Sequence, residues 1–110
     1  MDINTATISF SALSQETRLS VFRLMVKAGD KGMLAGEIGE ALNVKQNTMS
    51  ANLNVLMQAG LLKNKREGRG IRYFIDFQNM GHLLAFLLED CCGGKPEVCR
   101  PAIEKILKCC

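Results

Sequence analysis

The sequence predicts one mainly α-helical domain with a single small β-hairpin, and three observations lead to this fold class. Apolar residues recur at helical spacing over most of the N-terminal half of the chain. Two short helical segments there are separated by a turn of only three or four residues. Directly after them, two strand-like segments flank a turn that contains two glycines. A chain of 110 residues has room for one such domain with a modest core.

The chain is expected to begin with two helices, over residues 3–13 and 15–28. Ser14 suits the N-cap of the second helix, and Gly29 suits its C-terminal end. Each helix carries apolar residues, namely Ile8, Phe10 and Leu13 in the first and Leu19, Phe22 and Val26, with the neighbouring Leu24 and Met25, in the second.

A helix-turn-helix is predicted next. Residues 35–42 form its first helix, and Asn43 suits the left-handed position that ends it. Residues 46–59 form its second helix, which Gly60 terminates. One face of this second helix is apolar and is expected to point inward: Met49, Leu53, Leu56 and Met57.

The hairpin and the last helices follow. Residues 61–65 and 71–77 are predicted strands around a turn over residues 66–70, and strands placed after a helix-turn-helix make a winged helix. A long helix from Asn79, its expected cap, to about Asp90 is apolar on more than one face, which indicates burial against a partner subunit. Pro101 suits the first position of a final short helix.

Composition places the chain in a broad class. The net charge of +3 is mild. The longest apolar run, residues 80–88, is interrupted by Gly81 and His82 and is far too short to cross a membrane. The N-terminus lacks the basic and apolar regions of a signal peptide. We therefore expect a cytoplasmic protein with reduced thiols, and the odd number of cysteines, 5, also argues against a disulfide framework.

Two neighbouring surfaces predict DNA binding. The second helix of a helix-turn-helix enters the major groove, and here it carries short amides and hydroxyls that can bond to base edges or phosphates. The predicted readers on this helix are Gln46, Asn47, Thr48, Ser50, Ala51 and Asn54. The hairpin directly downstream is basic, and its arginines can hold the phosphate backbone or the minor groove: Arg66, Arg69 and Arg72.

Three segments resemble the ArsR/SmtB repressors. Residues 14–25 (SQETRLSVFRLM) are similar to the helix that precedes the helix-turn-helix of that family, and residues 35–62 are similar to the helix-turn-helix itself. Residues 66–73 (REGRGIRY) are similar to its wing. The resemblance covers about residues 10 to 92 and implies a homodimer, paired through the first and last long helices, on a two-fold operator in double-stranded DNA. Asn52 departs from the family, which usually has His at this position.

Three cysteines predict a site for a soft, thiophilic ion. Cys91 and Cys92 are adjacent, so we expect the long helix to end there, at Gly93 and Gly94, and a turn to bring Cys99 back toward the pair. We therefore divide the chain into residues 1–92, for DNA binding and dimerisation, and a cysteine-bearing extension, 93–110. Cys109 and Cys110 at the chain end are more often incidental than ligands.

The ligand itself follows from the resemblance and not from the spacing. The run CCGGKPEVC, residues 91–99, resembles the arsenic-responsive subgroup of the family with a C-terminal site. Residues 35–42 hold no cysteine and the chain has one histidine, His82, so the other inducer sites of the family are absent. The resemblance implies a repressor that arsenite releases from its operator, with antimonite left open as a second inducer and no organic cofactor.

The alternatives to this hypothesis are two other sensors, a winged helix that binds only proteins, and one class of enzyme. A thiol-redox or persulfide sensor would join two of the cysteines, and a zinc or cadmium sensor would take a fourth ligand from Cys109 or Cys110. A phosphate-cradling cysteine enzyme needs an arginine six residues after the cysteine. Those positions hold Glu97, Val98 and Lys105, so we expect no enzyme.

Overall fold

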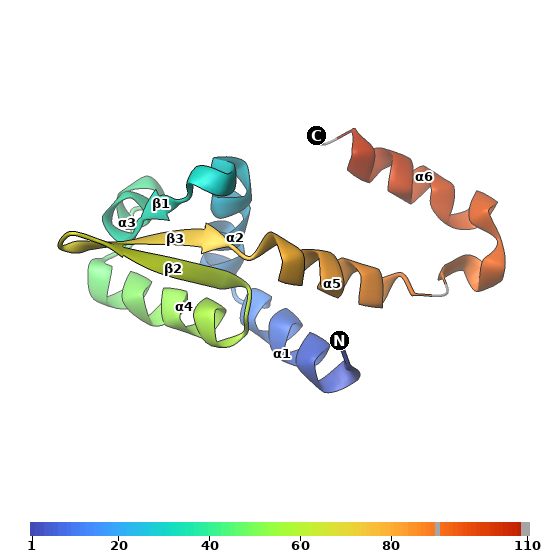
Figure 1. Ribbon diagram of the computed structural model, residues 1–110, viewed down its shortest axis with the longest axis horizontal. Helices are drawn as coiled ribbons and strands as arrows, with labels where there is room; N and C mark the ends of the chain where they lie inside the picture. Colours follow the sequence, from blue (N-terminus) through green and yellow to red (C-terminus); the bar gives the residue numbers. More distant parts are fainter. Residues whose placement is uncertain (90, 109–110) are drawn as a thin grey trace.

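The computed structural model describes residues 1–89 and 91–108, and of Cys91 and Cys92 it describes only the backbone. Five helices and a small sheet form the body, and a sixth helix lies beyond it (Figure 1). In chain order the elements are α1 (Ile3–Leu13), α2 (Glu16–Ala28), the 3-10 turn η1 (Gly29–Lys31), β1 (Met33–Leu34), α3 (Ala35–Leu42), α4 (Gln46–Gln58), β2 (Leu62–Glu67), β3 (Gly70–Ile75), α5 (Phe77–Leu87), η2 (Cys91–Gly94) and α6 (Pro96–Leu107).

The sheet confirms the predicted hairpin and adds a strand. It is antiparallel in the order β1-β3-β2, so β3 is central. The hairpin turn is shorter than the five residues predicted, because Glu67 and Gly70 already pair and only Gly68 and Arg69 lie between them. Gly68 has φ 59°, which a two-residue turn requires. The two-residue β1 was not predicted, since it is too short to show an alternating pattern.

The core lies between α2, α3, α4 and the sheet. Its fully buried side chains include three of the four residues predicted to point inward from the second helix of the helix-turn-helix: Met49, Leu53 and Leu56. Met57 is half-buried against the same core. Ile38 and Ile75 fill the space between α3 and the sheet, and both are 1% exposed or less.

The first two helices bury only some of their apolar residues. In α1 the small side chains Ala6, Ser9 and Ala12 are buried, whereas Ile8 and Phe10 are exposed. In α2 the buried residues are Val21 and Met25, and two of the apolar residues predicted from spacing, Leu19 and Val26, are exposed. Small residues allow α1 to approach the body closely, and its large ones are left on the outside.

The predicted caps of α2 and α5 were wrong. The side chain that caps α2 is Gln15, whose Oε1 accepts from the backbone N–H of Arg18 at 2.9 Å, while the Ser14 hydroxyl donates to the last turn of α1. α5 starts before Asn79, because the Asp76 carboxylate accepts from the Asn79 N–H at 3.0 Å and thereby caps the helix.

The C-terminal segment turns back at two glycines, as predicted. The predicted end of α5 at about Asp90 was wrong, because the helix ends at Leu87 and the following Leu88 and Glu89 form a turn; Asp90 itself lies outside the described residues. Gly93 and Gly94 both have positive φ, 55° and 82°. Pro96, and not Pro101 as predicted, is the first residue of α6, so Pro101 lies inside this helix. Helix α6 packs on η2 and lies apart from α1 to α4 (Figure 1).

The described part of the chain has no helix with the length and apolar character that crossing a membrane would need.

We expect Gly32→Ala to lower the free energy of unfolding by roughly 2 kcal/mol, measured by urea denaturation. Gly32 has φ 65°, and a Cβ there would collide with the Tyr73 carbonyl oxygen and the Phe74 ring. Gly36→Ala in α3 is the matched control, since its Cβ meets nothing within 4 Å. The control should be neutral or stabilising by up to about 1 kcal/mol. Equal stability of the two variants would contradict the packing described for β3.

Candidate nucleic-acid interface

The turn between α3 and α4 fixes how the second helix is presented. Asn43 adopts the predicted left-handed conformation, with φ 55° and ψ 48°. The N–H of Val44 donates to the Gly39 carbonyl at 2.9 Å and so closes the end of α3. A Cβ on Gly39 would meet the Gln46 side chain and the Val44 carbonyl oxygen. Glycine at this position therefore lets the start of α4 pack closely on α3.

The predicted readers of α4 lie on its solvent side. All six are exposed: Gln46, Asn47, Thr48, Ser50, Ala51 and Asn54. The buried residues of the same helix point to the core, so one face is apolar and the other is short and polar. In Figure 1 the N-terminal end of α4 and the tip of the β2–β3 hairpin lie at the same end of the molecule. This is the arrangement that a helix in the major groove and a wing beside it require.

A hollow of about 580 Å³ lies between α3, α4 and the hairpin. Gln46 and Ser50 line it from α4, and Arg69 lines it from the hairpin tip. The structure therefore brings together predicted residues that lie far apart in the sequence. Glu37 and Glu40 line the α3 side, and the carboxylate of Glu37 accepts from the Leu34 N–H at 2.8 Å, which stabilises the start of α3.

The basic residues of the hairpin are not equivalent. Arg66 and Arg69 are exposed, together with Lys63 and Lys65. Arg72 differs, because two hydrogen bonds fix its side chain. Its Nε donates to Glu67 Oε2 at 2.8 Å, and its Nη1 donates to the Lys31 carbonyl at 3.4 Å. Its side chain is 25% exposed. Arg72 thus braces the hairpin against η1, and the tip residues are more available to a phosphate.

Asn52, the position that departs from the resembled family, is half-buried and does not belong to the exposed face. Its Oδ1 accepts from Nη1 of Arg18 at 3.3 Å. Sequence reasoning missed this partner, because Arg18 lies 34 residues earlier and its charge suggests only a solvated helix face.

The cysteine site stays a prediction. The side chains of Cys91 and Cys92, and all of Cys109 and Cys110, lie outside the described residues. Cys99 is half-buried on α6, and its Sγ lies 3.8 Å from the Pro96 carbonyl oxygen. Among the side chains that are described, no three of His, Cys, Asp and Glu gather as metal ligands would.

Known proteins share this fold and sequence pattern. Residues 13–64 match a family described as a helix-turn-helix domain. Over 67 residues the chain is 37% identical to the transcriptional repressor SdpR of Bacillus subtilis (strain 168), a match that covers 61% of this chain and 71% of that protein. The chain belongs to the helix-turn-helix transcriptional regulators. This assignment agrees with the expectation that it is not an enzyme.

Solved structures define the type of regulator. One match is Mb0332 from Mycobacterium bovis, a possible ArsR-family regulator whose winged helix-turn-helix DNA-binding domain is homodimeric. The TM-score is 0.66 and the identity is 26%, over 77% of this chain and 76% of that one. An ArsR-like regulator from Rhodococcus sp. RHA1 matches with a TM-score of 0.68 and 27% identity, over 94% of this chain and 92% of that one. The regulator is therefore of the ArsR-like winged-helix type.

The hairpin tip should contribute mainly salt-dependent affinity. We expect the double variant Arg66→Gln/Arg69→Gln to bind DNA roughly tenfold more weakly, and its plot of log affinity against log salt to be about two units less steep, because two phosphate contacts are lost. Fluorescence anisotropy with a DNA duplex over a salt series measures both. The matched control is Arg23→Gln/Lys27→Gln on α2, which removes the same charge away from the hairpin. If the control bound DNA as weakly as the hairpin variant, the hairpin tip would be excluded as a specific contact to the DNA phosphates.

Proposed function

We propose that this regulator is an arsenite-responsive repressor, which binds a two-fold operator as a homodimer in the cytoplasm. Trivalent arsenic bound by Cys91, Cys92 and Cys99 releases it from DNA. The observation that carries the proposal is the position of the cysteine segment. It follows α5 directly, and the other end of α5 is hydrogen-bonded to the end of the recognition helix α4.

The donor set fits the ion. Trivalent arsenic takes three sulfurs in a pyramid, and thiolates are the soft ligands that such ions prefer. Cys91 and Cys92 lie in η2, and only Lys95 separates η2 from α6, the helix that carries Cys99. The two positive-φ glycines between them reverse the chain. The backbone thus supports convergence of the three cysteines, and the subgroup resemblance of residues 91–99 supports arsenic as the ion.

The outer faces of α1 and α5 support a homodimer. These two helices contact each other, and both leave large apolar side chains exposed. They are Ile3, Ile8 and Phe10 on α1 and Leu84, Leu87 and Leu88 at the end of α5. A soluble monomer seldom exposes so much apolar surface in one region. The Mb0332 domain, which has this fold, is homodimeric.

A direct connection leads from α5 to α4. Nδ2 of Asn79, in the first turn of α5, donates to the Gly60 carbonyl at 2.6 Å, just beyond the C-terminal end of α4. The N–H of Asp76 donates to the Leu61 carbonyl at 3.0 Å. A shift of α5 within the dimer would therefore move the end of α4 with it. A coupling of ~1–3 kcal/mol is typical and is reciprocal, so DNA must weaken arsenite binding by the same factor.

The proposed dimer predicts that Leu84→Glu/Leu87→Glu will be largely monomeric. Two charges on the exposed face of α5 would have to be buried, so dimerisation should weaken at least roughly 100-fold. Sedimentation velocity over a concentration series measures the change. Val26→Glu, at an exposed apolar residue of α2, is the control and should leave the dimer intact. A dimer that survives the α5 changes would place the interface elsewhere.

The proposed inducer site predicts that arsenite, under reductant, lowers the affinity of the wild-type protein for its operator roughly 5- to 150-fold. Cys91→Ser, Cys92→Ser and Cys99→Ser should each abolish this effect, because three sulfurs are needed. Anisotropy with the DNA upstream of the gene measures the release, and X-ray absorption should count three sulfurs around the arsenic.

The double variant Cys109→Ser/Cys110→Ser is the control for thiol loss and should still respond. If arsenite still released the three serine variants from operator DNA, these cysteines could not be the inducer site. Release by peroxide, polysulfide, zinc or cadmium, with none by arsenite, would reject the ion and favour the corresponding sensor.

A further inference from the structure

Arg18 connects two helices that are otherwise separate in the chain. Its Nε donates to the Ala12 carbonyl at 2.6 Å, near the C-terminal end of α1. Its Nη1 donates to Asn52 Oδ1 at 3.3 Å, in the middle of α4. The backbone N–H of Arg18 donates to Oε1 of Gln15, which fixes the position of Arg18 at the start of α2. One side chain thus joins the end of α1 to the recognition helix.

The chemistry of this bridge suits arginine alone. The guanidinium is planar and presents several donors in a fixed fork, so it can reach two acceptors in different directions at once. Arg18 and Asn52 are half-buried and Ala12 is 4% exposed, which strengthens charge-assisted hydrogen bonds relative to those in water. The Ala12 carbonyl is also one of the last of α1, where a cation is favourable.

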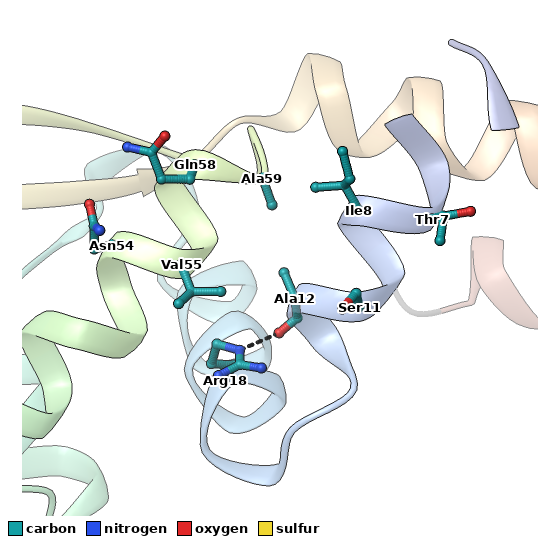
Figure 2. Close-up of a pocket in the computed structure, with 9 residues that line it drawn as sticks. All are labelled: Thr7, Ile8, Ser11, Ala12, Arg18, Asn54, Val55, Gln58 and Ala59. Carbon is teal, nitrogen blue, oxygen red and sulfur yellow. Dashed lines mark hydrogen bonds between the residues drawn. The ribbon is translucent and has the colours of Figure 1, made fainter. Parts of the chain in front are cut away.

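The packing between α1 and α4 leaves a gap beside this bridge. A groove of about 470 Å³ opens between the two helices, and Arg18 lines it (Figure 2). Ile8 of α1 and Val55 of α4 form its walls and remain 49% and 38% exposed. On the side of this groove, the Arg18 side chain adds a hydrogen-bonded link to the packing contacts that α1 and α4 make elsewhere.

The orientation of α4 matters because operator recognition needs two recognition helices at a set separation and angle. Asn52 lies on the same helix as the exposed readers, and Asn54 of that set lines the groove beside Arg18. We propose that Arg18 is a positioning residue: through Ala12 and Asn52 it sets the orientation of α4 relative to α1 and so determines selectivity for the operator, without touching DNA. This inference rests on the DNA-binding part of the proposed function and not on arsenite.

The test compares operator DNA with a scrambled duplex, over a salt series. Arg18→Lys keeps the charge but cannot reach both acceptors, and Asn52→Ala removes one acceptor while the Ala12 bond remains. Each variant should lower the ratio of operator to scrambled affinity roughly tenfold and leave the salt slope unchanged. The double variant should be no worse than the poorer single one, because both changes break the same link. Arg23→Gln on α2, an exposed arginine, should keep the wild-type ratio.

Two results would overturn the inference. An unchanged ratio in Arg18→Lys and Asn52→Ala, whatever happens to their thermal unfolding, would leave the bridge a purely structural contact. An equal loss of affinity for both duplexes in Arg18→Gln, with a salt slope about one unit smaller and Arg18→Lys unaffected, would make Arg18 a phosphate contact. A wild-type protein with no preference for the operator would instead reject the proposed function.

Discussion

The whole molecule depends on helix α4 having one apolar and one polar face. Met49, Leu53 and Leu56 are fully buried, and burying side chains of this size contributes about 1.5–3 kcal/mol each. The same burial turns the short polar residues of α4 to solvent. Because the buried face rests on α2, α3 and the sheet, α4 cannot turn about its own axis without breaking the core. The stability of the fold and the exposure of the predicted DNA-reading residues therefore depend on the same packing.

Much of this could be predicted from the sequence, because the signals are local. The bounds of α1 and α3, the left-handed Asn43 and the buried face of α4 follow from spacing and from residues with strong conformational preferences. The predictions that failed depend on contacts from elsewhere. Asp76 caps α5 where Asn79 was expected, since the Asn79 side chain is used to hold Gly60. Strand β1 exists because β3 offers it an edge.

In the candidate site, too, the local features could be predicted and the contacts between distant elements could not. The exposed readers of α4 and the tip arginines were predicted from residue type and pattern, and the structure exposes them at one end of the molecule. The roles of Arg18 and Arg72 could not be predicted, because each is defined by an acceptor on a distant element: Asn52 for Arg18 and the Lys31 carbonyl for Arg72. The sequence shows that a residue is basic, but only the fold shows which acceptors its side chain hydrogen-bonds to.

Pro101 gives α6 an internal weak point. Proline has no N–H, so the Glu97 carbonyl lacks the backbone donor that would join it to the next turn of the helix. The segment that holds Cys99 is thus tied to the rest of α6 by one hydrogen bond fewer than in a regular helix. The missing hydrogen bond lowers the free-energy cost of unwinding this segment. Cys99 therefore lies in the part of α6 whose connection to the following turns is weakened by Pro101.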